Sequence, residues 1–243
     1  LSEVTIDYAR PSVRERTIFG DLVPYNVRWR TGANRNTLIT FSHDVVISGQ
    51  PLSKGTYALY TTPNKDAWMV YFYNKTDNWG TPAQWDEQQI SLAVRVEVQD
   101  VSHTESFRIS IENITLDTAD LQLVWEKTAI QLPIVFPTNK IMESNLSKMN
   151  VDTASAIDLY TAAVYYFNND KDLKIAKEWI TKAVALRDDA FWFYRQKSLI
   201  HEALGELKMA IDAAQRSLEL AESAGNQRFI DLNKKQLLEW TEK

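Results

Sequence analysis

Three stretches of alternating apolar and polar side chains constrain the fold of this chain more than any other feature. Between residues 92 and 98, 107 and 112, and 121 and 126, every second side chain is Leu, Val, Ile, Phe or Trp. Successive side chains of a β-strand point to opposite faces, so this period of two gives each strand one face for a core. The other face is mostly polar, and the pattern is typical of antiparallel sheets.

Shorter β runs occur through the rest of residues 1–136. Three of them are Val4–Tyr8, Thr37–Phe41 and Val45–Ile47. The runs Gly55–Tyr60 and Ala67–Tyr73 flank a turn-rich Pro-Asn-Lys-Asp segment, which predicts a hairpin. Eight to ten short strands without intervening helices indicate a sandwich or a barrel. We predict an antiparallel β-sandwich domain over residues 1–137.

The character of the sequence changes after Pro137, the last proline of the chain. Residues 138–150 are polar, and we interpret them as a linker. From residue 151 to residue 243 the apolar side chains follow a helical period, in runs of 13 to 18 residues separated by polar turns. The predicted fold class is therefore β plus α in two domains, with an α-helical region following the sandwich.

An internal repeat organises the helical half. Residues 172–186 and 206–220 share small and apolar side chains at a constant offset of 34 residues. The matched pairs are Ala176 with Ala210, Ala183 with Ser217, and Leu186 with Leu220. The pattern resembles the tetratricopeptide repeat, in which small residues allow the second helix to cross the first closely.

The resemblance covers residues 157–224, about two repeats, and residues 226–241 resemble a capping helix. Lys197 and Ser198 depart from the Leu-Gly pair that the repeat usually has. A solenoid this short buries little surface, so the helices could simply pack on the sandwich or mediate self-association. The functional alternative is a concave groove that binds a peptide of a protein partner.

The N-terminal half carries a recognisable string. It comprises Val4–Pro11, Arg16–Tyr25, Val27–Asn34 and Gly55–Tyr57. It resembles a bacterial family of predicted exported proteins that is catalogued as domain of unknown function 2911, over about residues 1–136. The resemblance implies a β-rich fold and a periplasmic or secreted location, with the signal peptide outside this chain. It implies no established activity, so no catalytic residue carries over.

Arginine is concentrated within this string. Residues 10–35 contain six Arg, and the first Lys of the chain is Lys54. A guanidinium group binds carboxylates and phosphates through two parallel hydrogen bonds, which an ammonium group cannot do. We therefore predict a site for a small anion or a sugar, with the following residues in it: Arg10, Arg16 and Arg30 as clamps, Trp29 as a stacking wall, and Asn34 beside them.

The structural alternative for the same residues is an internal network. In that case Arg10 or Arg30 pairs with Asp7 or Asp21 and fixes an irregular N-terminal segment onto the sandwich. The two interpretations differ in whether the guanidinium groups face a ligand or the protein itself.

A second candidate lies between residues 74 and 89, which do not fit a strand. This loop contains Trp79, Trp85 and the acidic pair Asp86-Glu87. A loop this long is often functional, although its two indoles could equally plug one end of the sandwich. Paired carboxylates can hydrolyse glycosides when they are held at a suitable separation.

Several classes of chemistry have no support in the sequence. There is no Cys, and His43, His103 and His201 are scattered, so we expect no metal and no cofactor. No nucleophile elbow or phosphate-binding loop occurs. The net charge is −5 and no apolar run reaches a membrane-spanning length, so we expect no nucleic acid partner and no membrane span.

These observations favour a non-catalytic exported binding or scaffold protein. Its sandwich would bind a small anionic or sugar ligand, and its helices would bind a protein partner or a second copy. One alternative is a hydrolase acting on a carbohydrate or small anionic substrate through the Arg/Trp/Asn string. The other alternative is a purely structural protein.

Overall fold

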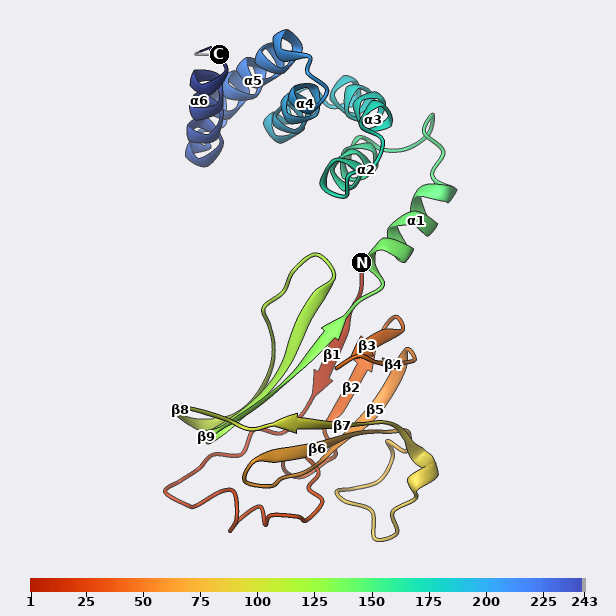
Figure 1. Cartoon of the computed structure of the whole chain (residues 1–243), viewed down its shortest axis with the longest axis vertical. Helices are drawn as coiled ribbons and strands as arrows, with labels where there is room; N and C mark the ends of the chain where they lie inside the picture. Colours follow the sequence, from red (N-terminus) through yellow and green to blue (C-terminus); the bar gives the residue numbers. More distant parts are fainter. Residues whose placement is uncertain (242–243) are drawn as a thin grey trace. The chain divides into compact units, whose positions relative to one another are not determined.

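The computed structural model describes residues 1–241, and the chain forms two compact units. The first unit, Leu1–Glu143, contains the strands, and the second begins at Ser144 and contains most of the helical region (Figure 1). Helix α1 (Thr138–Lys148) spans this division and occupies most of the stretch that we interpreted as a linker. Its many Asn, Ser and Lys residues hide the helical period, although Met142 is buried.

One sheet of the first unit has five strands in the order β1-β2-β5-β6-β7. The strands are β1 (Val4–Asp7), β2 (Leu38–Phe41), β5 (Gly55–Thr62), β6 (Ala67–Tyr73) and β7 (Ile90–Glu97). Every neighbouring pair is antiparallel. Strands β5 and β6 pair directly across residues 63–66, which confirms the predicted hairpin.

The other sheet has four strands in the order β4-β3-β9-β8. They are β4 (Gln50–Leu52), β3 (Val45–Ile47), β9 (Thr118–Val135) and β8 (Gln99–Glu112). Strands β8 and β9, with 14 and 18 residues, form a hairpin much longer than the short strands we expected (Figure 1). The hairpin is irregular near Glu126, whose φ of 55° belongs to the left-handed region, and the pairing register shifts there.

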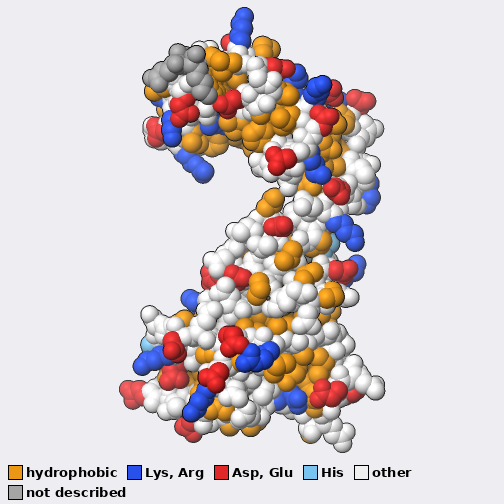
Figure 2. Space-filling view, viewed as in Figure 1, with side chains coloured by type: hydrophobic (Ala, Val, Ile, Leu, Met, Phe, Trp, Pro, Cys, Tyr) orange, Lys and Arg blue, Asp and Glu red, His pale blue; other side chains and the backbone are white. Residues whose placement is uncertain are grey.

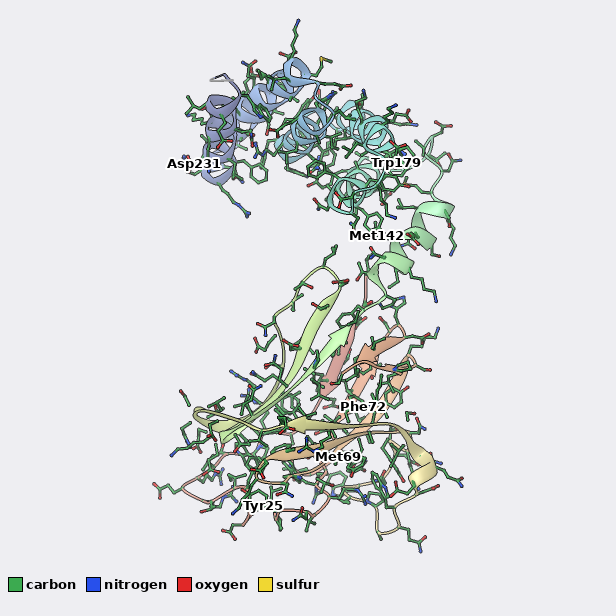
Figure 3. All side chains as sticks on the ribbon, viewed as in Figure 1. Tyr25, Met69, Phe72, Met142, Trp179 and Asp231 are labelled. Atoms are coloured by element: carbon green, nitrogen blue, oxygen red, sulfur yellow. The ribbon has the colours of Figure 1, made fainter. Side chains whose placement is uncertain are left out.

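The two sheets enclose one apolar core, as the alternation of side chains requires. Leu92, Val94 and Val96 of β7 are buried in it, whereas the intervening Arg95 and Glu97 are exposed. On β6, Phe72 is fully buried in this core and Met69, an odd number of residues away, lies on the opposite face of the strand (Figure 3). These features confirm the predicted antiparallel sandwich.

The second unit consists of helical hairpins. Its helices are α2 (Ala156–Asn168), α3 (Leu173–Leu186), α4 (Phe191–Ala203), α5 (Leu207–Ser223) and α6 (Gln227–Thr241). Helix α2 packs on α3 and α4 packs on α5, while α6 packs on α5 (Figure 1). Helices α3 and α5 begin 34 residues apart, as the repeat predicts.

The matched small residues of the repeat lie in the helix crossings. Ala176, Ala183, Ala210 and Ser217 are all fully buried. The turn after α4 uses Gly205 with a φ of +75°, whereas the turn after α2 uses Asp170 with a φ of 51°. The 34-residue offset matches Gly205 to residue 171. In the first turn the left-handed residue is Asp170 instead, one position earlier than this match predicts.

Across the described residues, we find no helix with the combination of length and apolar character needed to span a bilayer.

Candidate functional site

The outer face of the five-stranded sheet carries a cluster of aromatic side chains. Residues of β5 alternate in direction, so Leu59 lies in the sandwich core while Ala58 and Tyr60 lie on the other side of the sheet. Tyr73 joins them from β6, and Trp85 stacks on Tyr73 with ring centroids 4.2 Å apart. We call this surface the loop-covered face, because the segment 74–89 lies over it.

The covering loop is fixed to this face by hydrogen bonds. The fully buried Tyr60 hydroxyl donates to Gly80 O at 3.0 Å and accepts from Asn78 Nδ2 at 3.0 Å. Burial raises the pKa of Tyr60, so the hydroxyl keeps its proton. Of the two loop tryptophans, Trp85 packs against the sheet and Trp79 is 69 % exposed. Trp85 therefore covers the outer face of the sheet and Trp79 is exposed, so neither indole plugs one end of the sandwich.

Arginines from the N-terminal string reach the same face. Residues Arg28–Arg30 run antiparallel to the end of β5, because Trp29 and Thr61 exchange two main-chain hydrogen bonds of 2.7 and 2.9 Å. The Trp29 ring packs against the core, so its two neighbours point to the outer face.

Both arginines meet the covering loop there. The guanidinium carbon of Arg28 lies 3.6 Å from the centroid of the Trp85 ring, a cation–π contact. Arg30 lies against Gly80, where an added Cβ would come 3.0 Å from its Nη1 atom. The string and the loop, predicted separately as candidate sites, thus form one site.

Several polar atoms on this face have no hydrogen-bond partner among the described residues. The side chain of Asn36 is the most complete case, since it is 7 % exposed and neither its oxygen nor its nitrogen is paired. It lies two residues before Leu38, which is paired with Ala58, and so it points to the loop-covered face beside Tyr60.

The other unpaired atoms of the site belong to the string and the covering loop. They are Arg28 Nε, Asn78 Oδ1 and Trp85 Nε1. Buried polar atoms are nearly always hydrogen-bonded in proteins, and each one left unpaired costs free energy. A set of donors and acceptors gathered under one loop therefore indicates a place built for a polar molecule.

Among the predicted site residues, the structure brings Arg30 and Asn34 together. Arg30 Nη1 donates to the main-chain oxygen of Asn34 at 2.8 Å. Trp29 lies close to them in sequence, but its ring stacks on Trp125 with centroids 5.8 Å apart and its Nε1 donates to Gly32 O. Trp29 therefore supports the site from the core side and offers no wall to a ligand.

Arg10 and Arg16 lie elsewhere, along β8. Arg10 Nε donates to Phe107 O at 3.1 Å, and Arg16 donates to the main-chain oxygens of Ser12 and Val13. Arg10 fixes the irregular segment onto the sandwich, as the structural alternative supposed, whereas Arg16 makes its hydrogen bonds within that segment. Both arginines bind carbonyl groups, and no ion pair to Asp7 or Asp21 occurs among residues 1–241.

Sequence analysis did not single out Arg28, Asn36, Tyr60 or Asn78 as site residues. Arg28 had a usable signal, because it alternates with Arg30 around the apolar Trp29 and must share its face. Asn36 and Tyr60 had none, since their burial depends on a loop that begins more than ten residues further along the chain.

The acidic pair of the covering loop has a local role. The Asp86 carboxylate accepts from Gln88 N at 3.0 Å and caps the short 3₁₀ helix Glu87–Gln89, while Glu87 is exposed. Over residues 1–241, no three His, Cys, Asp or Glu side chains gather closely enough to hold a metal ion.

The fold and site define a two-unit protein, in which a β-sandwich with a loop-covered aromatic face precedes a tetratricopeptide-like helical region. A family model described as Protein of unknown function (DUF2911) matches residues 1–134, more than half of the chain. The chain belongs to this family, and the β-rich fold implied by the resemblance is confirmed. Neither a curated protein nor a solved structure matches the chain.

Proposed function

We propose that this protein is a non-catalytic exported binding protein whose sandwich binds a small polar ligand at the loop-covered face. The observation that carries the proposal is the buried, unpaired amide of Asn36, together with the unpaired atoms of Arg28, Asn78 and Trp85 in the string and the covering loop. Evolutionary optimisation for stability alone would favour an apolar residue of the same size at position 36.

The chemistry of the unpaired atoms favours a sugar over a small anion. Asn36 Oδ1 and Asn78 Oδ1 are acceptors, whereas Arg28 Nε and Trp85 Nε1 are donors. A hydroxyl group can both donate and accept, but an ionised carboxylate only accepts. The exposed indole of Trp79 on the covering loop adds a large aromatic surface for one face of a sugar ring.

Binding is favoured over hydrolysis because of the positions of the acidic groups. The Asp86 carboxylate is engaged in a helix cap, and Glu87 is exposed beside it on the same short helix. A glycosidase needs two carboxyl groups facing each other across the scissile bond. The resemblance to predicted exported proteins supports the proposed exported location, and fractionation of cells that produce the natural full-length protein tests it.

The helical unit supplies the second half of the proposal, an interaction surface for a protein partner or a second copy. Hydrophobic side chains lie among charged ones over this unit (Figure 2), and Ile157, Leu186 and Met209 are each at least half exposed. Light scattering during size-exclusion chromatography separates self-association from partner binding, because only self-association raises the mass of the purified chain.

A thermal-shift screen tests the ligand proposal. The purified chain is heated with neutral mono- and oligosaccharides, with phosphate and with small carboxylates. A ligand of the native state raises the melting temperature in a concentration-dependent way. We expect a sugar to do so, and we expect the shift to disappear in Asn36→Leu but to persist in Arg35→Ala, a change at the exposed neighbouring residue. Shifts by anions alone, or equal shifts in both variants, would contradict the proposal.

A further inference from the structure

A groove in the helical unit offers a second site, unrelated to the loop-covered face. It lies between α3 and α4, extends to the start of α5, and has a volume of about 690 Å³. Three lysines line it, together with His201 and the acidic residues Glu178 and Glu206. The lysines are Lys177, Lys182 and Lys197.

Two of the three lysines already have acidic partners. Lys177 Nζ lies 2.7 Å from Glu206 Oε1, and Lys182 Nζ lies 2.9 Å from Asp152 Oδ1. Lys197 has neither a hydrogen bond nor an ion pair among the described residues, although its side chain is half-buried. Burial lowers the pKa of Lys197, as expected for an ammonium group without a counter-charge.

The position of Lys197 in the repeat makes it unusual. The tetratricopeptide pattern has an apolar residue there, and the equivalent residue of the first hairpin, 34 positions earlier, is the fully buried Ala163. Helix packing alone would favour an apolar side chain at this position, because even a half-buried cation without a partner is destabilising. A ligand that supplies the missing negative charge would explain the lysine.

His201 adds a second unpaired polar atom to the same wall. Its Nδ1 lies 2.6 Å from Glu206 Oε2, while its Nε2 is buried and has no hydrogen-bond partner. A ligand reaches Nε2 only if the wall shifts, so the Lys197 amine is the group that a ligand meets first.

We propose that this groove binds a single carboxylate group of a ligand that has an apolar body, with Lys197 as the anchor. One lysine without a partner matches one negative charge, whereas a phosphate dianion would require more. Ala185 and Met209, which also line the groove and are exposed, provide contacts for the apolar body.

Titration of the full chain with hexanoate, followed by two-dimensional amide NMR, tests this inference. Hexanamide has the same body without the charge, and inorganic phosphate has charge without the body. Lys197→Met removes the amine at a position that the repeat normally fills with an apolar residue, so this variant should fold. Lys182→Met removes a lysine that lines the same groove but is already paired, and it serves as the matched control.

We expect saturable shifts around α3 and α4 with hexanoate, an affinity at least about tenfold weaker in Lys197→Met, and an unchanged affinity in Lys182→Met. Hexanamide and phosphate should both bind more weakly than hexanoate. The inference is overturned if hexanoate gives no saturable shifts, if Lys197→Met binds as well as the natural chain, or if hexanamide or phosphate binds at least as tightly as hexanoate.

Discussion

Replacing Asn36 by leucine tests whether the fold needs the Asn36 amide or only ligand binding needs it. Leucine branches at Cγ as asparagine does, with methyl groups in place of the amide oxygen and nitrogen, and the side chain at this position is 7 % exposed with both of its polar atoms unpaired. An unpaired buried polar group costs about 1 to 3 kcal/mol, and an apolar side chain of the same shape removes that cost. We therefore expect Asn36→Leu to raise the free energy of unfolding by about 1 to 3 kcal/mol.

The assay is urea unfolding together with a thermal melt. For a unit of this size each kcal/mol corresponds to roughly 3 °C, so the melting temperature should rise by roughly 3 to 9 °C. Asn233→Leu is the control, because Asn233 is also fully buried but its Nδ2 donates to Ser217 Oγ at 2.8 Å. Removing that satisfied amide should destabilise the protein.

Refutation would take a simple form. If Asn36→Leu destabilises the protein as much as Asn233→Leu does, the Asn36 amide is satisfied in solution. The Asn36 amide would then stabilise the fold, and it would not be an unpaired group kept for ligand binding.

Three further predictions concern the covering loop and the helical unit. Trp85→Ala removes the contact that holds the loop and should cost about 2 kcal/mol, with faster hydrogen exchange confined to the loop. Gly80→Ala should cost about 1 to 2 kcal/mol in urea unfolding, because Gly80 has a φ of +71° and its added Cβ would press on Arg30. Hydrogen bonds, first of all from Lys177, lower the pKa of Glu206, so its stabilising effect is present above the unfolded pKa and is lost as the pH falls through the folded pKa. Glu206→Gln should therefore lower the stability of the helices at neutral pH and reduce the further loss of stability below about pH 4, measured by urea unfolding followed by circular dichroism.

Much of the fold follows from local periodicity. The alternation along residues 92–98 determines which side chains enter the core, and the 34-residue offset places Ala176 and Ala210 in equivalent helix crossings. Helix α1 was not predicted, because its few apolar residues are diluted by Asn, Ser and Lys. Its helical structure depends on interactions with the rest of the chain, which composition does not reveal.

The candidate site was only partly predictable, because it depends on pairings between distant residues. The sequence places Arg30 next to Trp29, but it does not say that Trp29 pairs with Thr61 at the end of β5. That pairing turns the arginines toward the covering loop. The burial of Asn36 requires both this pairing and the closure of the loop, and neither leaves a signal in the residues around it.

Hydrogen exchange with a bound sugar tests the central claim most directly. The chain would be labelled with and without a saturating concentration of the sugar that gives the largest thermal shift. Our account predicts protection confined to residues 28–36 and to the covering loop, 74–89, because both segments contribute the unpaired polar atoms. If no sugar shifts the melting temperature, or if protection appears only in other segments, the loop-covered face is not a ligand site.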